Sequence, residues 1–149
     1  MNNSMIEKIF KAEQNVSALP LRLIAGIIFA AHGAQKLFAW FGGYGLDGTG
    51  QWMESIGLAP GYLMALMAGS SEFFGGLLLI AGFLTRPAAL ALAFTMLVAI
   101  FSVHFENGLF MSNNGYEFGL SLFAISLALV FQGAGKFSLD NIVSKKIAS

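Results

Sequence analysis

The chain has 149 residues, of which 56% are hydrophobic and only 11% charged, with a formal net charge of zero. A soluble domain is about 45–50% apolar and about 25% charged, so the composition excludes a disordered chain and disfavours a cytosolic globule. So short a chain has too little interior to bury these residues, which leaves the lipid bilayer as their solvent. The zero net charge removes the case for nucleic-acid binding. The absence of cysteine excludes disulfides, iron–sulfur clusters and thiolate zinc sites.

Four apolar stretches predict an all-α integral membrane protein. A membrane span needs about 20 mostly apolar residues, and the four stretches cover residues 19–40, 60–84, 87–104 and 116–131. Prolines 60 and 87 lie in first turns, where a helix tolerates proline. The short connection at residues 85–87 predicts that the second and third helices are antiparallel neighbours. We therefore expect one domain over residues 1–149, folded as a four-helix bundle.

The basic residues predict the orientation of this bundle. If the N-terminus is inside, seven of the eight basic residues lie on the inner side: Lys8, Lys11, Arg22, Arg86, Lys136, Lys145 and Lys146. Lys36 alone lies toward the outside. An excess of Lys and Arg marks the cytoplasmic side of a membrane protein. Both termini are therefore expected in the cytoplasm, with the chain in a bacterial-type inner membrane.

Two further segments have the character of a membrane interface. The apolar side chains of residues 5–10 fall on one face of a short helix, which predicts an N-terminal helix lying on the inner surface. The outer loop over residues 41–59 is rich in glycine and carries Tyr44 and Trp52, and such aromatic residues favour the membrane–water boundary. The loop fits either a cap folded over the outer end or a segment anchored at the interface.

Polar residues inside the spans are the candidate site, because ionisable groups in a bilayer are costly and usually functional. A rise of about 1.5 Å per residue puts His32 about 20 Å and His104 about 26 Å above the inner surface. Glu72 falls about 18 Å below the outer surface on the same basis. One outward-facing pocket is therefore expected. Its predicted ligand-binding residues are His32, Gln35, Lys36, Glu72, His104 and Glu117.

Several of these residues also fit a purely structural role. Lys36 and Glu72 suit a buried ion pair as well as they suit a ligand site. Glu117 suits the first turn of a helix, where the helix dipole favours negative charge. Arg22, close to the inner boundary, is expected to extend its charged head to the interface. No dedicated metal site is predicted. The weak metal candidates are His32, His104 and Glu106.

Five short motifs follow one another along the chain. They are Arg22-Leu23-x-x-Gly26, His32-Gly33-x-x-Lys36-Leu37, Glu72-x-x-Gly75-Gly76, Gly82-x-x-Thr85-Arg86-x-Ala88-Ala89 and Gly133-x-Gly135-x-x-Ser138-Leu139-Asp140. In this order, and with His104 and Glu117, the chain resembles the DoxX family of small four-helix membrane proteins. The resemblance implies membrane redox systems, including quinol oxidase and thiosulfate–quinone oxidoreductase complexes. It assigns a catalytic role to no residue.

The leading functional hypothesis is a redox-associated component that holds a quinone or a similar small aromatic ligand. The oxygens of the quinone would accept hydrogen bonds from His32, Gln35 and Lys36. Glu72 or Glu117 would relay protons. Four phenylalanines are expected to line the ring: Phe29, Phe38, Phe73 and Phe101. Whether the chain itself catalyses a reaction stays open, because the redox chemistry would use either a bound cofactor without thiolate ligands or a partner oxidoreductase.

Three alternatives remain open at this point. His32 and His104 are candidate axial ligands of a b-type haem, and histidines with carboxylates are candidate ligands of a divalent ion. A polar pocket open to the outside also fits a small-solute transporter. Four helices are few for a transporter, so this alternative favours a homodimer. The last alternative is a non-catalytic membrane subunit that supports a partner oxidoreductase.

Overall fold

The computed structural model describes residues 3–11 and 13–147, and this part of the chain contains helices and no strand. Its α-helices are α1 (Asn3–Phe10), α2 (Ala18–Phe38), α3 (Gly45–Ser55), α4 (Gly61–Ala81), α5 (Thr85–Ala99), α6 (Glu117–Gln132) and α7 (Leu139–Ile147). The predicted all-α class is confirmed. The predicted N-terminal helix is present as α1, whereas α7 follows the last predicted helix and was not expected.

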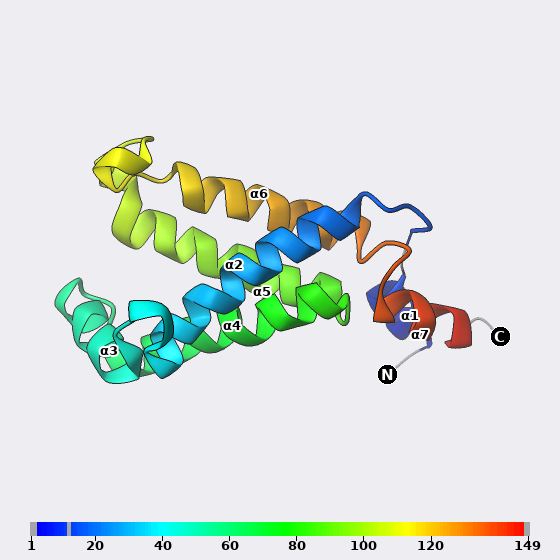
Figure 1. Cartoon of the computed structure of the whole chain (residues 1–149), viewed down its shortest axis with the longest axis horizontal. Coiled ribbons are helices and arrows are strands. Elements are labelled where there is room, and N and C mark those ends of the chain that lie inside the picture. The colour runs from blue at the N-terminus through cyan, green and yellow to red at the C-terminus, as the bar shows by residue number, and fades with distance from the viewer. Residues whose placement is uncertain (1–2, 12, 148–149) are drawn as a thin grey trace.

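Among the described residues, three helices are long and apolar enough to cross a membrane. They are α2, α4 and the continuous helical stretch Thr85–Asn107, in which α5 runs on into a π-helical turn. The fourth, α6, has 16 residues and is about 24 Å long, somewhat short of a hydrocarbon core of about 30 Å. It runs antiparallel beside α5 (Figure 1). Three predicted spans therefore have the necessary length, and the fourth is a shorter apolar helix.

Left-handed residues end two of the long helices earlier than predicted. Ala39, with φ of 59°, ends α2 at Phe38. Gly82, with φ of 64°, ends α4 at Ala81, and its N–H donates to the carbonyl of Leu79. Glycine is the usual residue for this helix-ending geometry because it has no Cβ to clash. The turn between α4 and α5 is therefore formed by residues 82–84, ahead of the position that was predicted.

Glycines allow α2 and α4 to approach each other closely. A Cβ added to Gly26 would lie 2.8 Å from the carbonyl oxygen of Gly76, and one added to Gly33 would collide with the backbone of Phe73. Small residues at such positions let helix backbones pack closely within a membrane. This contact brings the polar residues of α2 next to Glu72 of α4.

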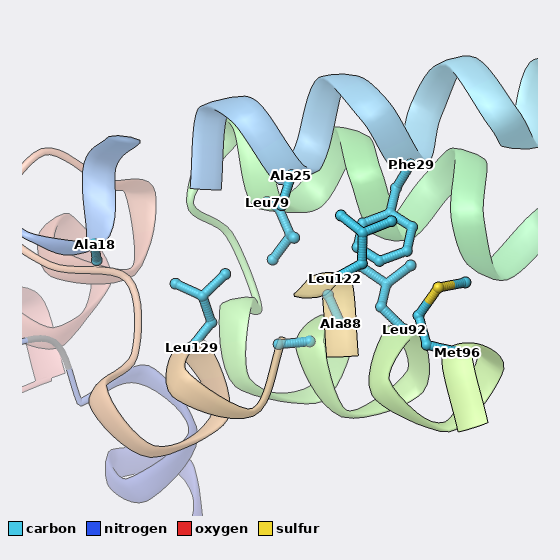
Figure 2. Close-up of a cluster of buried hydrophobic side chains, with 10 residues drawn as sticks. Ala18, Ala25, Phe29, Leu79, Ala88, Leu92, Met96, Leu122 and Leu129 are labelled. Atoms are coloured by element: carbon cyan, nitrogen blue, oxygen red, sulfur yellow. The ribbon is translucent and has the colours of Figure 1, made fainter. Parts of the chain in front are cut away.

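A buried apolar cluster fills the middle of the bundle. Phe29 comes from α2, Leu79 from α4, Leu92 from α5, and Leu122 and Leu129 from α6, so that all four long helices contribute (Figure 2). The exposed fraction of each of these side chains is 4% or less. Large apolar side chains on the outer surfaces of the helices, such as Phe94 and Phe131, are exposed. Such a distribution suits a bundle surrounded by lipid.

Arg22 is fully buried, so the expectation that its head extends to the interface is wrong. Its Nη1 donates to the carbonyl oxygens of Leu79 and Ile80 at 3.0 and 3.3 Å, and its Nη2 donates to that of Phe137 at 2.5 Å. The last carbonyls of a helix have no partner within it. The arginine therefore satisfies the end of α4 and ties it to the segment before α7.

Asp140, in the first turn of α7, provides a second tie. Its carboxylate accepts hydrogen bonds from the backbone N–H groups of Leu84 and Thr85 at 2.8 and 2.9 Å, at the start of α5. This is an N-cap supplied by a residue far away in the sequence. The contact holds α7 at one end of the bundle, where it lies beside α1 (Figure 1). The helix α3 lies at the opposite end.

Candidate functional site

A cavity of about 130 Å³ lies among α2, α4, α5 and α6, beside the segment that joins α5 to α6. This segment is at the end of the bundle away from α1 and α7 (Figure 1). We call this space the inner cavity. Its lining residues are Phe29, His32, Lys36, Glu72, Met96, Ala99, His104, Met111, Gly115, Phe118, Gly119 and Leu122. Four of the six predicted ligand-binding residues, namely His32, Lys36, Glu72 and His104, therefore surround one space. Their role in binding a ligand stays a prediction.

Lys36 and Glu72 form an ion pair between α2 and α4. The Lys36 Nζ lies 2.6 Å from the Glu72 Oε2, and the exposed fractions of the two side chains are 23% and 5%. The ion-pair interpretation and the ligand-site interpretation of these residues are therefore compatible, since the pair forms part of the cavity wall. A lysine has three N–H donors, and this pair uses one of them.

His104 enters the cavity wall from a distorted stretch of helix. The backbone follows a π-helical turn over Ile100–His104, and such turns frequently occur at functional sites. The His104 Nδ1 lies 2.9 Å from the carbonyl oxygen of Asn114, and a carbonyl can only accept. Nδ1 therefore carries the proton in this contact, which leaves Nε2 as the acceptor of the neutral ring.

Aromatic rings form the apolar part of the wall. Phe29 lines the inner cavity as predicted, but Phe38 and Phe73 pack edge to face on each other, and Phe101 packs on Phe105. Phe38, Phe73 and Phe101 therefore do not line the cavity. The spacing of residues along a helix does not determine how the helix is rotated about its axis, so it could not predict which rings face the cavity.

Sequence reasoning missed Phe118, whose ring centroid lies 6.1 Å from that of His32. It also missed Met96 and Met111 as lining residues. The one available signal was that Phe118 directly follows Glu117 at the start of the fourth predicted helix. That position places it at the depth of the predicted pocket.

Gln35 and Glu117 lie outside the inner cavity. The Gln35 Nε2 donates to the carbonyl oxygen of Phe41 at 3.2 Å, and its side chain borders a second hollow instead. The Glu117 Oε1 accepts a hydrogen bond from the backbone N–H of Met111 at 2.7 Å. Glu117 is in the first turn of α6 as predicted, where it fastens the preceding loop.

The residues that the structure describes contain no group of three His, Asp or Glu side chains placed to hold a metal ion. Glu106, one of the weak metal candidates, is exposed and is not part of the cavity lining. His32 and His104 both line the cavity, but a space of this size accommodates a single ring and not a porphyrin.

Comparison with known sequences agrees with this architecture. Residues 17–105 match the DoxX profile. The chain is 36% identical over 142 residues to inner membrane protein YqjF of Escherichia coli (strain K12), covering 91% of this chain and 98% of that protein. It is 37% identical over 130 residues to putative oxidoreductase CatD of Bacillus subtilis (strain 168), covering 87% and 89%. No solved structure matches significantly. The chain therefore belongs to the DoxX family and is a multi-pass protein of the bacterial inner membrane.

Proposed function

We propose that the protein is a redox-associated membrane component that holds the ring of a quinone, or of a similar small aromatic compound, in the inner cavity. The observation that carries the proposal is the composition of the cavity wall. Two phenylalanine rings, Phe29 and Phe118, share this wall with two histidines and the Lys36–Glu72 pair. A relative named putative oxidoreductase CatD is consistent with a redox setting.

The volume of the inner cavity favours a single ring. An apolar cavity of about 150 Å³ binds benzene, and the inner cavity of about 130 Å³ is similar in size. Ligand sites are usually apolar, with a few polar groups that fix orientation. A benzoquinone ring meets this description, with one oxygen at each end and apolar faces between them.

The polar groups at the wall suit both forms of such a ring. Quinone oxygens only accept hydrogen bonds, and the Lys36 ammonium has N–H donors beyond the one given to Glu72. A quinol donates from its hydroxyls, and the Nε2 of His104 is an acceptor. Reduction of a quinone to a quinol takes two electrons and two protons. In this proposal Glu72 and Lys36 relay the protons and a partner oxidoreductase supplies the electrons.

The proposal includes an orientation. Lys8 lies in α1 and Lys11 directly follows it, and Lys145 and Lys146 lie in α7, so four basic residues gather at the end of the bundle that holds both helices. By the positive-inside rule this end is cytoplasmic. The inner cavity, so called because it lies inside the bundle, then faces the side of the membrane opposite the cytoplasm.

Binding of duroquinone tests the proposal. This quinone has one ring, and its four methyl groups prevent it from alkylating lysine. We expect purified protein in lipid nanodiscs to bind it, and Glu72→Gln to weaken binding about tenfold, because the glutamine removes the charge that holds Lys36 at the wall. The matched control is Asp47→Asn, which removes an exposed carboxylate from the first turn of α3 and should bind as the unchanged protein does.

Ring size provides the second arm of the experiment. Dimethylnaphthoquinone has the same chemistry with two fused rings, so the inner cavity should bind it about tenfold more weakly than duroquinone. Met96→Ala, which removes a side chain from the lining, should narrow that difference. Equal binding of both quinones, with no effect of Glu72→Gln, would show that they merely partition into lipid.

A further inference from the structure

A second, larger hollow lies at the same end of the bundle, between the end of α2 and the start of α3. We call it the vestibule. Its volume is about 460 Å³, and its lining residues are Gln35, Lys36, Gly42, Gly43, Tyr44, Gly48, Thr49 and Trp52. Sites for small ligands usually have volumes of about 300–1,000 Å³. The vestibule has that size, whereas the inner cavity is smaller.

Lys36 lines both spaces. Its side chain is 23% exposed, whereas that of its partner Glu72 is 5% exposed. Glu72 is part of the inner cavity wall and is not part of the vestibule wall. Lys36 therefore borders the vestibule, whereas Glu72 does not.

The vestibule wall carries one kind of charge. Lys36 is the charged residue among the eight lining residues, and no acidic side chain is one of them. The two carboxylates of α3 are directed elsewhere, since Glu54 accepts a hydrogen bond from the backbone N–H of Gly61 and Asp47 is exposed outside the lining. A cleft lined by one sign of charge attracts ligands of the opposite sign.

Two aromatic side chains at the wall are available for stacking. The exposed fractions of Tyr44 and Trp52 are 83% and 45%. Among the ring contacts of the described residues, none involves either of them, whereas the neighbouring Trp40 packs on Phe38 and Phe41. Trp and Tyr combine a large flat surface with a hydrogen-bonding tip, so an aromatic ligand could stack here.

Gly43 and Gly48 lie at tight contacts in the vestibule wall. A Cβ at Gly43 would collide with Gln35, and one at Gly48 would lie 2.9 Å from the Tyr44 Cβ. Gly43 therefore lets the loop approach α2 closely, and Gly48 lets the first turn of α3 pack on Tyr44.

We propose that the vestibule is a separate binding site for small aromatic acids, with one ring and one carboxylate or phenolate. The ring stacks on Tyr44 and Trp52, and the anionic oxygen accepts hydrogen bonds from Lys36. The site does not require a quinone in the inner cavity. Because one ammonium serves both walls, an anion in the vestibule competes with Glu72 for it.

The two tryptophans of the chain provide the test. Trp40→Phe leaves Trp52 in the vestibule wall as the only indole, and Trp52→Phe leaves Trp40, which is outside the wall. The probe is para-nitrobenzoate, which quenches indole fluorescence on contact. In nanodiscs of zwitterionic lipid we expect quenching of Trp52 that saturates and that an excess of benzoate, used as a competitor, reverses. Quenching of Trp40 should be weak and should not saturate.

Charge variants identify the role of Lys36. The charge variants are made in the Trp40→Phe protein. Replacing both Lys36 and Glu72 by Gln removes the ammonium without leaving an unpaired carboxylate. This double change should weaken para-nitrobenzoate binding at least tenfold. Glu72→Gln alone should strengthen it several-fold, because the ammonium loses its competitor. Lys36→Arg should retain binding, since it retains the charge.

These results also separate the vestibule from the proposed quinone site, because Glu72→Gln is expected to weaken duroquinone binding and to strengthen para-nitrobenzoate binding. Equal quenching of both tryptophans would overturn the proposal, since it would indicate partition into lipid. Binding that the double charge variant leaves unchanged would also overturn it. Quenching of Trp52 by brominated lipid tails, without quenching by para-nitrobenzoate, would assign the indole to the membrane interface instead.

Discussion

The Nζ of Lys36 and the Oε2 of Glu72 lie 2.6 Å apart, and this ion pair links α2 to α4 at the wall of the inner cavity. An ion pair of low exposure is expensive to desolvate, and it often stabilises a protein less than well-packed apolar residues would. Its presence inside an apolar bundle therefore indicates a use besides stability. The cavity on one side and the vestibule on the other are the two places where that use can be found.

Energetic coupling between Lys36 and Glu72 is the first prediction. Glu72→Ala leaves the ammonium without its carboxylate, and Lys36→Met leaves a carboxylate that is 5% exposed. Each change should lower the free energy of unfolding by about 1–3 kcal/mol, a range discounted for the partial exposure of the lysine. The double variant should lose less than the sum. A double-mutant cycle in denaturant measures this, and additive losses would contradict a coupled pair.

Loss of the long-range cap at α5 is the second prediction. Asp140→Ala leaves the N–H groups of Leu84 and Thr85 without their acceptor, which should destabilise the protein by about 1–3 kcal/mol. Thermal unfolding in detergent measures the effect. Asp47→Ala, in the exposed first turn of α3, is the matched control. Equal melting of the two variants would show that Asp140 does not anchor the C-terminal segment.

Close packing of α2 on α4 leads to the third prediction. A methyl group at Gly33 collides with the backbone of Phe73, whereas one at Gly75 lies 3.1 Å from the Leu92 side chain, which can move. Gly33→Ala should destabilise the protein by about 1–3 kcal/mol through overpacking. Gly75→Ala should change its stability less. If the two variants melt alike, the predicted backbone contact is absent.

The orientation of the bundle is the fourth prediction, and the absence of cysteine makes it simple to test. Single cysteines can replace Lys8 and Lys145 at one end, and Gln51 and Asn113 at the other, all of which are exposed. A membrane-impermeant maleimide added to intact spheroplasts should label only the last two. The reverse pattern would place the termini outside, and labelling of one terminus alone would contradict an even number of spans.

Much of the fold was predictable because lipid imposes strong rules on composition. Apolar length alone predicted the helices that became α2, α4 and α5, and depth along each helix predicted that His32, Lys36, Glu72 and His104 would surround one space. Rotation about the helix axis was not predictable, which is why Phe73 and Phe101 were expected at a cavity that they do not line.

Contacts between distant segments were also beyond sequence reasoning. The burial of Arg22 follows from hydrogen bonds to carbonyl groups at the end of α4 and in a loop more than a hundred residues away. Likewise the π-helical turn that carries His104 has no marker in the local sequence. Such features depend on tertiary packing and not on propensity.

Photoaffinity labelling tests the central claim most directly, namely that an aromatic ring occupies the inner cavity. An azido-substituted benzoquinone would be photolysed with the protein in nanodiscs, and the labelled peptides would be identified by mass spectrometry. We predict labels within residues 29–36 and 115–122, which an excess of duroquinone removes. Labels spread over lipid-facing positions such as Phe94 and Phe131, and unaffected by duroquinone, would contradict the account.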